Sequence, residues 1–318
     1  MRPELQKVVS ETEKAIAGKR DVIEKILMAM LARGHVLLDD VPGVGKTTLA
    51  VALSQALGLS CRRVQFTPDV LPSDLTGFSM YDRESGQFVY RPGALNGISL
   101  LLGDEINRAL SRTQSALLEA MEENQVTVDG ITYPLSEPFL VIATENSTGT
   151  AGTQPLPFAQ MDRFLARLSL GYPDYEAQMA LLRARQARNP LDQVQGVLSR
   201  EEFAAMQLEA GSVTSGEAIL DYITRLTIAS RRREELEAGI SPRGALFLDR
   251  MAKACAWMDG RDYVTGTDVR KVFRDVCAHR VLLKDDAGGK TAEDVLEDLL
   301  ETVSTPDRHY PFAGMLKR

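Results

Sequence analysis

The 318-residue sequence contains no apolar run near the roughly 18–20 residues that a membrane-spanning helix needs. Its most apolar short stretch, Ile98 to Leu102, has the length of a strand. Residues 1–14 also lack the apolar segment and the small-residue cleavage site of a secretory signal. We therefore expect neither membrane insertion nor secretion.

Patterns for disulfides and metal sites are missing as well. The three cysteines, Cys61, Cys255 and Cys277, form no C-x-x-C pair, and the three histidines lie too far apart for metal-ligand spacing. An odd, scattered set of cysteines is typical of reduced thiols in a cytosol. We expect a cytoplasmic protein in which the cysteines are small core residues.

An excess of positive charge is absent too. The chain has 37 Lys+Arg against 44 Asp+Glu, a net charge of −7, whereas proteins held to nucleic acid by bulk electrostatics usually present a net basic face. This argues against that class but leaves a local basic channel or an anionic small ligand possible. The length fits one large or two moderate domains, since a domain has about 100–200 residues.

The chain divides into two halves of different pattern. Residues 1–172 alternate short apolar runs, helical periodicity and Gly/Pro turns, which predicts an α/β domain. Helices are expected over 14–33 and 46–57, and parallel strands over 35–38, 63–66, 98–103, 139–143 and 164–170. Two hairpins interrupt this order, over about 77–92 and, around Asp129-Gly130, over 124–136.

Residues 173–318 are expected to form a small all-α domain. Helix-capping pairs recur there, at Ser199 with Glu202, Thr214 with Glu217, and Thr291 with Asp294. Ser241-Pro242 adds an N-cap followed by proline in the first helical turn.

A glycine-rich turn between an expected strand and helix carries the first chemical motif. It reads Gly43-Val44-Gly45-Lys46-Thr47-Thr48, and this context predicts a phosphate-binding loop. Glycines let backbone N–H groups face a polyphosphate, and the helix N-terminus adds partial positive charge. Lys46 would reach the β- and γ-phosphates and Thr47 would hold Mg²⁺. Asp40 stands where the pattern G-x-x-x-x-G-K-[ST] has its first glycine.

Two acids follow the apolar run Leu100-Leu101-Leu102-Gly103. Strand ends in open α/β sheets form the ligand-binding edge, so Asp104 and Glu105 are expected there. Asp104 would hold Mg²⁺ through water, and Glu105 would polarise the attacking water.

Three further polar residues have both a functional and an ordinary explanation. Asn146, after the strand 139–143, could hold the attacking water or cap the strand with an Asx turn. Arg163 could stabilise transition-state charge on a neighbouring subunit's nucleotide, or form a surface ion pair. Arg243 could reach the γ-phosphate or lie in solvent.

In this order, the motifs resemble the MoxR family of AAA+ ATPases over nearly the whole chain. The matching stretches are VPGVGKTTLA, QFTPDVLPSDLTG, LLLGDEINRA, the run VIATENSTGT to GTQPLPFAQMDRF, and SPRGAL. The resemblance implies an α/β core with a five-stranded parallel sheet, a C-terminal helical lid, and ATP with Mg²⁺ as ligands.

The resemblance also implies a role for each candidate residue. Lys46 and Thr47 match Walker A and Asp104 and Glu105 match Walker B, whereas Asn146 matches sensor one, Arg163 the arginine finger and Arg243 the sensor-two arginine. Ala17 and Gly18 match the turn that usually flanks the adenine, and Arg108 is a second candidate for the trans-acting arginine. Asp40 and Glu145 depart from the family pattern, which usually has Gly and Gln there.

For function, the resemblance implies a homo-oligomeric ring, a hexamer or similar, that acts as a chaperone-like machine on protein complexes. Family partners often carry a von Willebrand factor type A domain, and the end of the chain at Arg318 leads us to expect that such a domain belongs to another protein.

Two other functions remain open at this point. Related hairpins serve nucleic-acid motors, but the tips here, residues 83–86 and 128–130, are mixed to acidic. Asp40 raises the second alternative, a nucleotide-gated scaffold with little hydrolysis.

Overall fold

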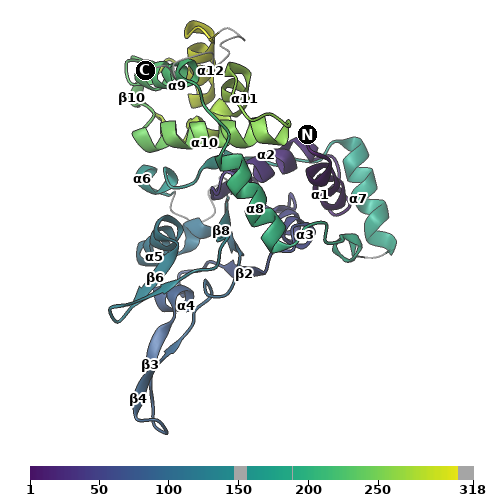
Figure 1. Ribbon diagram of the computed structural model, residues 1–318, viewed down its shortest axis with the longest axis vertical. Coiled ribbons are helices and arrows are strands. Elements are labelled where there is room, and N and C mark those ends of the chain that lie inside the picture. The colour runs from purple at the N-terminus through teal and green to yellow at the C-terminus, as the bar shows by residue number, and fades with distance from the viewer. Residues whose placement is uncertain (147–155, 188, 307–318) are drawn as a thin grey trace, which may run out of the picture. The chain divides into compact units, whose positions relative to one another are not determined.

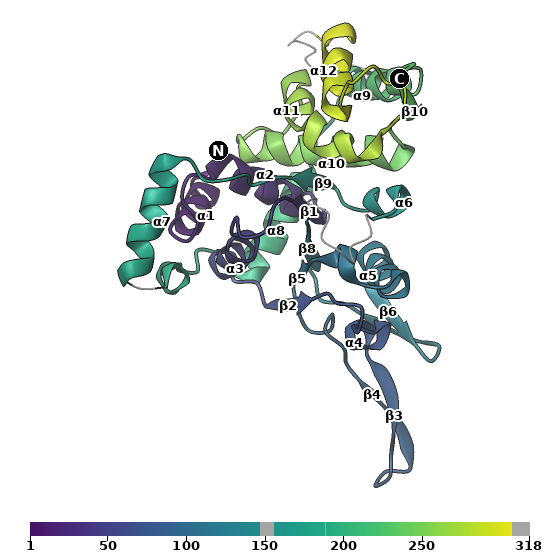
Figure 2. The same ribbon diagram turned by 180° about the vertical axis from the view of Figure 1, so that it is seen from behind.

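The computed structural model describes residues 1–146, 156–187 and 189–306, which form two compact units, Met1–Ala210 and the part that begins at Gly211 (Figures 1 and 2). No helix in these described ranges is both long and apolar enough to cross a membrane.

A five-stranded sheet forms the centre of the first unit. Its order is β2-β5-β8-β1-β9, and each adjacent pair is parallel, as expected. The strands are β1 (Val36–Asp39), β2 (Cys61–Gln65), β5 (Leu100–Asp104), β8 (Leu140–Glu145) and β9 (Ala166–Leu168). Because all five run the same way, the residues that follow β1, β5 and β8 meet at one edge.

Helices cover both faces of this sheet, which explains the continuous apolar runs of its inner strands. α1 (Pro3–Glu13) and α3 (Lys46–Ala56) lie on one side, and α4 (Pro72–Thr76) and α5 (Ser111–Glu123) lie on the other (Figures 1 and 2). On the α5 side, Leu117 and Leu118 join a buried cluster with Leu101 and Val141 of the sheet. Fully burying such a side chain contributes about 1.5–3 kcal/mol.

The helix expected over 14–33 is shorter and has an unpredicted neighbour. α2 is Arg20–Leu31 and buries Ile23, Ile26 and Leu27 as the periodicity indicated. Residues before it form a turn in which Gly18 has φ +72°, and α1 precedes that turn.

Both expected hairpins are present. β3 (Phe78–Asp82) pairs with β4 (Gln87–Arg91), and β6 (Gln125–Val128) pairs with β7 (Ile131–Pro134). The rings of Tyr90 in β4 and Tyr133 in β7 stack with centroids 3.8 Å apart, and the Tyr90 hydroxyl donates to the Thr76 carbonyl. The two hairpins are therefore joined at their bases.

The units divide between Ala210 and Gly211, not at the expected boundary between residues 172 and 173. The segments after β9 therefore belong to the first unit. Two hydrogen bonds link them to its helices: Gln207 donates to the Met30 carbonyl at 2.7 Å, and the Val197 N–H donates to the Ala56 carbonyl at 2.9 Å. These segments comprise α7 (Tyr175–Ala187), η2 (Pro190–Gln193) and α8 (Arg200–Gly211), while η1 (Ile106–Arg108) and α6 (Phe158–Met161) lie earlier in this unit.

The second unit is mainly helical, as expected, with one small addition. Its helices are α9 (Glu217–Ser230), α10 (Pro242–Met258), α11 (Gly266–Cys277), η3 (Ala278–Arg280) and α12 (Ala292–Thr302). Between them β10 (Leu236–Ala238) pairs antiparallel with β11 (Leu282–Leu283), so the unit is not purely α-helical.

The expected caps form at three of four positions. Ser199 and Glu202 bond reciprocally before α8, Thr291 and Asp294 form a capping box on α12, and Ser241 accepts from the Gly244 N–H on α10. The prediction that Thr214 caps a helix is wrong. The N-cap position of α9 is Gly216, and Thr214 instead forms a β-bridge with Tyr263.

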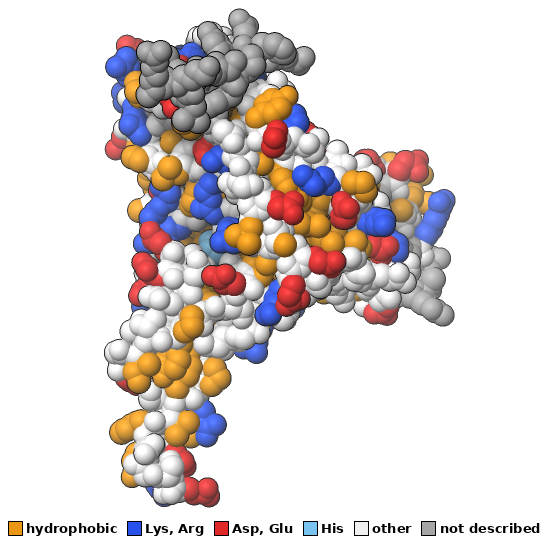
Figure 3. Space-filling model, in the orientation of Figure 1, with side chains coloured by type: hydrophobic (Ala, Val, Ile, Leu, Met, Phe, Trp, Pro, Cys, Tyr) orange, Lys and Arg blue, Asp and Glu red, His pale blue; other side chains and the backbone are white. Residues whose placement is uncertain are grey.

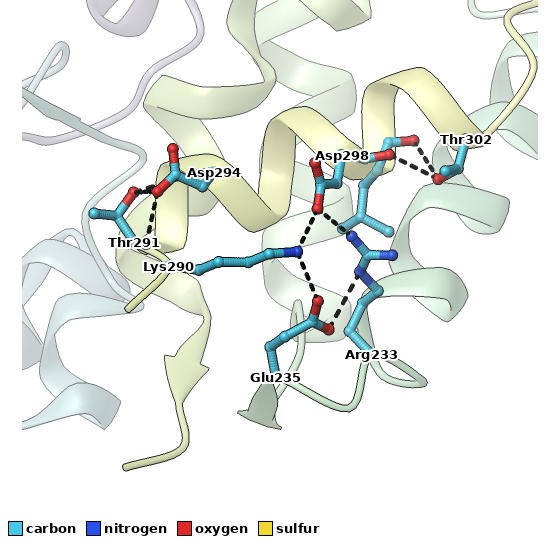
Figure 4. A network of polar contacts seen from close by, with 8 residues as sticks. Arg233, Glu235, Lys290, Thr291, Asp294, Asp298 and Thr302 are labelled. Atoms are coloured by element: carbon cyan, nitrogen blue, oxygen red, sulfur yellow. Dashed lines mark hydrogen bonds and ion pairs between the residues drawn. The ribbon is translucent and has the colours of Figure 1, made fainter. Parts of the chain in front are cut away.

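A surface network fastens α12 to the loop around β10. Lys290 donates to both Glu235 and Asp298, and Arg233 pairs with the same two carboxylates (Figure 4). These side chains are partly exposed, so each pair contributes little by itself.

All three cysteines are free thiols, and two of them are core residues as expected. Burial raises the pKa of Cys255 and of Cys277 to about 12. Cys61 is only half-buried, because it begins the edge strand β2.

Candidate nucleotide-binding site

The turn between β1 and α3 has the backbone that the glycine-rich motif predicts. Gly43 and Gly45 have φ values of +83° and +97°, and Gly45 is the N-cap of α3. A Cβ on Gly45 would lie 2.7 Å from the Ile16 side chain. The positive φ of Gly45 therefore favours glycine there, and the residues up to Thr48 begin a helix whose N-terminus favours anions.

The predicted adenine-flanking turn lies beside this loop. Ile16 touches Gly45, and a Cβ on Gly18 would lie 2.8 Å from the Cβ of Ala177 in α7. Ala17 and Gly18 are thus held between the loop and α7. Their contact with adenine stays a prediction.

Lys46 links the loop to the end of β8. Its Nζ donates to the carbonyls of Asp40 at 2.7 Å and Glu145 at 3.0 Å, and to Asn146 Oδ1 at 2.9 Å. Burial lowers the pKa of Lys46, an effect that nearby carboxylates partly offset. Lys46 is a buried cation in the first turn of α3, and such a cation is suited to binding a polyphosphate.

Thr47 and Asp104 face one another as a magnesium site requires. Thr47 Oγ1 donates to Asp104 Oδ2 at 3.2 Å, and Thr144 supports the other carboxylate oxygen at 3.4 Å. Hydroxyl and carboxylate oxygens are hard donors of the kind that Mg²⁺ prefers, so these two residues fit the ion.

Glu105 is held on both carboxylate oxygens. Asn146 Nδ2 donates to Oε1 at 2.7 Å, while Gln65 Nε2 and Arg108 Nη1 donate to Oε2 at 2.9 and 2.8 Å. Its backbone is left-handed, with φ +56°, and its N–H donates to Thr144 Oγ1. This turn brings the side chain back toward the end of β8.

Asn146 consequently belongs to the site and is more than a strand cap. Its amide accepts from Lys46 through Oδ1 and donates to Glu105 through Nδ2. Lys46 and Glu105 are thus connected through a single buried side chain.

Two residues of this site, Arg63 and Gln65, were not predicted. Both project from β2: Arg63 Nε donates to Asp104 Oδ2 at 2.6 Å, and Gln65 reaches Glu105. The available signal was the spacing of two polar residues at i and i+2 near the end of a strand, which places them on the same face.

Asp40, the departure from the loop pattern, uses its carboxylate to accept hydrogen bonds from the segment after β9. Oδ2 accepts from Ser169 Oγ at 2.9 Å and from the Gly171 N–H at 2.6 Å, and Oδ1 accepts from the Val41 N–H. Burial raises the pKa of Asp40, but these hydrogen bonds outweigh it and hold the pKa below its usual value. The residue anchors the segment after β9.

Glu145, the second departure, is paired in register with Asp39. Burial, and then the charge of Asp39, raise the pKa of Glu145. Arg167 forms an ion pair with Asp39 and so relieves part of this repulsion.

The candidate arginines lie in different surroundings. Arg108 pairs with Glu105 of its own chain at 2.8 Å, whereas Arg163 pairs with Glu122 of α5 at 2.9 Å. Arg243 lies in the first turn of α10 in the second unit, and its part in the site stays a prediction.

A second cluster of possible metal ligands is better explained by an arginine. Cys255, Asp259 and Asp268 lie close together, but Arg261 forms two hydrogen bonds to Asp268, at 2.7 and 2.6 Å. The Cys255 thiol, with its pKa raised to about 12, stays protonated near neutral pH. The guanidinium thus already balances the charge.

Comparison with known proteins agrees with this geometry. The family model for the ATPase family associated with various cellular activities matches residues 35–166, and that for the AAA lid domain matches residues 228–299. The chain is 36% identical to Chaperone MoxR1 of Mycobacterium tuberculosis, over 95% of this chain and 82% of that protein. The chain belongs to the MoxR family of AAA+ ATPases.

Two further proteins resemble this chain over almost their whole length. The protein YeaC of Bacillus subtilis is 42% identical over 96% of both chains. A crystal structure of a candidate ATPase from Cytophaga hutchinsonii is 36% identical, with a TM-score of 0.88 over 96% of this chain and 95% of the other. The α/β core with its lid is therefore the fold of this MoxR-family chain.

Proposed function

We propose that this MoxR-family chain hydrolyses ATP and uses the energy to remodel or mature protein complexes. The observation that carries the proposal is the continuous connection from Lys46 through Asn146 to Glu105, beside the facing oxygens of Thr47 and Asp104. Phosphate binding, metal binding and water activation would thus share one edge of the sheet.

Each part of the site has a task in this reaction. Lys46 and the backbone N–H groups of the loop bind the β- and γ-phosphates. Thr47 and Asp104 hold Mg²⁺, which neutralises charge on the phosphate oxygens when bound. Glu105 accepts a proton from water as its oxygen attacks the γ-phosphorus, the β–γ phosphoanhydride bond breaks, and ADP leaves with that bond's electrons.

Glu105 needs a free lone pair for that task. Of its donors, Asn146 can also orient the water, while Gln65 and Arg108 both occupy Oε2. Hydrogen bonds to the charged form lower the basicity of a carboxylate. Turnover therefore depends on how these donors rearrange around the substrate.

The proposal includes assembly of the chain into a homo-oligomeric ring, a hexamer or a ring of similar size. Arg163 is the candidate that we favour for reaching a neighbour's nucleotide, because its partner Glu122 lies in α5, whereas the partner of Arg108 is Glu105 of the site itself. Arg243 would contribute from the lid. The three free thiols support a cytoplasmic location.

The β3–β4 hairpin supports a protein client over a nucleic acid. Phe78, Met80, Tyr81 and Phe88 are all exposed, with Phe88 at 74%. In Figure 3, orange side chains gather in the region where Figure 1 places this hairpin. Exposed apolar groups of this kind mark protein contacts, whereas nucleic-acid grooves are basic. A partner with a von Willebrand factor type A domain is the class that we propose.

The Asp40 carboxylate accepts hydrogen bonds from Ser169 and Gly171, and its charge also acts on Lys46, so a nucleotide-gated scaffold with little hydrolysis stays the alternative. The test is phosphate release from the purified chain with ATP and Mg²⁺, followed by capture of clients on a Glu105→Gln variant loaded with ATP. Turnover that Glu105→Gln abolishes, and a type A domain protein among the captured clients, are expected. Absence of turnover with every client tested would overturn the proposal.

A further inference from the structure

The edge strand β2 places a positive charge on the metal-binding acid. In the β2–β5 register, Arg63 lies opposite Leu102 and Gln65 opposite Asp104, so both side chains reach the ligand-binding edge of the sheet. Arg63 is half-exposed, with 54% of its side chain accessible, while the Asp104 side chain is 7% accessible. A half-exposed cation thus meets a buried carboxylate.

The contact uses the oxygen that a metal would need. Asp104 Oδ2 accepts from Arg63 Nε at 2.6 Å and from Thr47 Oγ1 at 3.2 Å. An ion held between Thr47 and Asp104 would compete with the guanidinium for this oxygen, and the like charges would repel. The neighbouring Arg63 Nη2 also donates to Gln65 Oε1 at 3.2 Å, which keeps the side chain in this orientation.

We propose that Arg63 is a positioning residue that holds Asp104 in place before the metal–nucleotide complex binds and releases Oδ2 when it does. This inference rests on the proposed function. Arg63 forms an ion pair with a buried carboxylate, and its 54% exposure lets the guanidinium move into solvent at small cost. The consequence is a higher Mg²⁺ requirement than Thr47 and Asp104 alone would set.

The experiment measures metal-dependent binding of ADP, which avoids hydrolysis. With the full chain and a fluorescent ADP at fixed concentration, Mg²⁺ is titrated and the midpoint recorded; Mn²⁺ bound in the presence of ADP is counted by electron paramagnetic resonance. Arg63→Ala and Arg63→Gln are expected to lower the midpoint by up to about fivefold, as removal of a competing partly exposed ion pair implies. Arg63→Lys keeps the charge and should stay near the wild-type midpoint.

The neighbouring arginine provides a matched control. Arg62 carries the same charge on the same strand, but its Nη1 donates to the carbonyls of Gly93 and Ala94 at the base of the β3–β4 hairpin. Arg62→Ala should leave the midpoint unchanged. Circular dichroism checks that each variant is folded.

The remaining outcomes separate this inference from the proposed function. A midpoint equal to that of wild type, or one shifted equally by Arg62→Ala, overturns the role of Arg63. A raised midpoint in Arg63→Ala also overturns it, because Arg63 would then be a ligand of the nucleotide. A wild-type chain that binds no ADP at any Mg²⁺ concentration overturns the proposed function, and this inference with it.

Discussion

Lys46 in the phosphate loop and Asn146 at the end of β8 are joined by a 2.9 Å hydrogen bond between Nζ and Oδ1. The same asparagine donates to Glu105 at 2.7 Å. The residues that would bind phosphate and activate water are therefore held in one arrangement by a single amide, and a change at Lys46 is expected to affect both.

Lys46→Ala should weaken ATP binding by about 10- to 100-fold, the effect of losing a hydrogen bond to a charged group. It also leaves the carbonyls of Asp40 and Glu145 without this donor. Calorimetric titration with ATP and Mg²⁺ measures the change. Lys14→Ala removes an exposed lysine that pairs with Glu11 and should bind as wild type does; equal affinity in both variants would remove Lys46 from the site.

Glu105→Gln should bind ATP normally but hydrolyse it about 100- to 10,000-fold more slowly, because it removes the general base. The amide matches the carboxylate in size, so Gln65 and Arg108 can still donate to its oxygen. Single-turnover phosphate release and nucleotide binding are measured together. Unchanged turnover would contradict the role of Glu105, whereas lost binding would indicate a structural one.

The parallel sheet and the backbone of the glycine-rich loop were predictable because they depend on local chemistry: apolar runs form inner strands, and Gly43 and Gly45 permit the loop. Arg63 was not predictable, since its partner Asp104 lies 41 positions away and is reached through β2–β5 pairing. The anchoring role of Asp40 was not predictable either, because its partners Ser169 and Gly171 are distant in sequence and come near only in the folded chain. The unit boundary was misplaced because α7 and α8 have helical patterns but pack on the α/β core.

Arg163 and Arg108 can be separated by mixing subunits. If Arg163 acts in trans, mixing inactive Arg163→Ala subunits with inactive Glu105→Gln subunits should restore part of the ATP turnover, because an intact Glu105 site then meets the arginine of its neighbour. Glu122→Ala is the matched control, because it removes the partner of Arg163 and leaves the arginine itself. No recovery with Arg163→Ala, but recovery when Arg108→Ala subunits are mixed with Glu105→Gln subunits, would assign the role to Arg108.

Asp40→Gly restores the loop pattern but removes the anchor for the segment after β9. The expected loss at neutral pH is about 1–3 kcal/mol, as for hydrogen bonds to a charged group. The pKa of Asp40 is lowered in the folded chain, so its stabilisation is present above the unfolded pKa of about 3.9 and is lost as pH falls through the folded pKa. Amide exchange at Gly171 measures it locally.

Ser169→Ala, which removes one of the donors to Asp40, should accelerate exchange at Gly171 less than Asp40→Gly does. Unchanged exchange in Asp40→Gly would show that the Gly171 amide is protected by something else, and the anchoring role would be abandoned.

Asp268 should be the most sensitive ion-pair residue of the second unit. It accepts from Arg261 at 2.7 and 2.6 Å and from the backbone and hydroxyl of Thr265 at 2.8 and 2.6 Å. Burial raises the pKa of Asp268, but Arg261 and Thr265 outweigh it and lower the pKa overall. Asp268→Ala breaks a largely buried pair and should cost about 2–4 kcal/mol.

The single tryptophan reports on this unit, since Trp257 is buried in α10. Urea unfolding followed by its fluorescence should show the Asp268→Ala deficit above pH about 3.9, and the deficit should shrink as pH falls through the folded pKa. Lys290→Ala, in the exposed network of Figure 4, should have a smaller effect that salt reduces further. Equal losses in the two variants, or a deficit for Asp268→Ala that does not change with pH, would mean that the charge of Asp268 does not stabilise the start of α11.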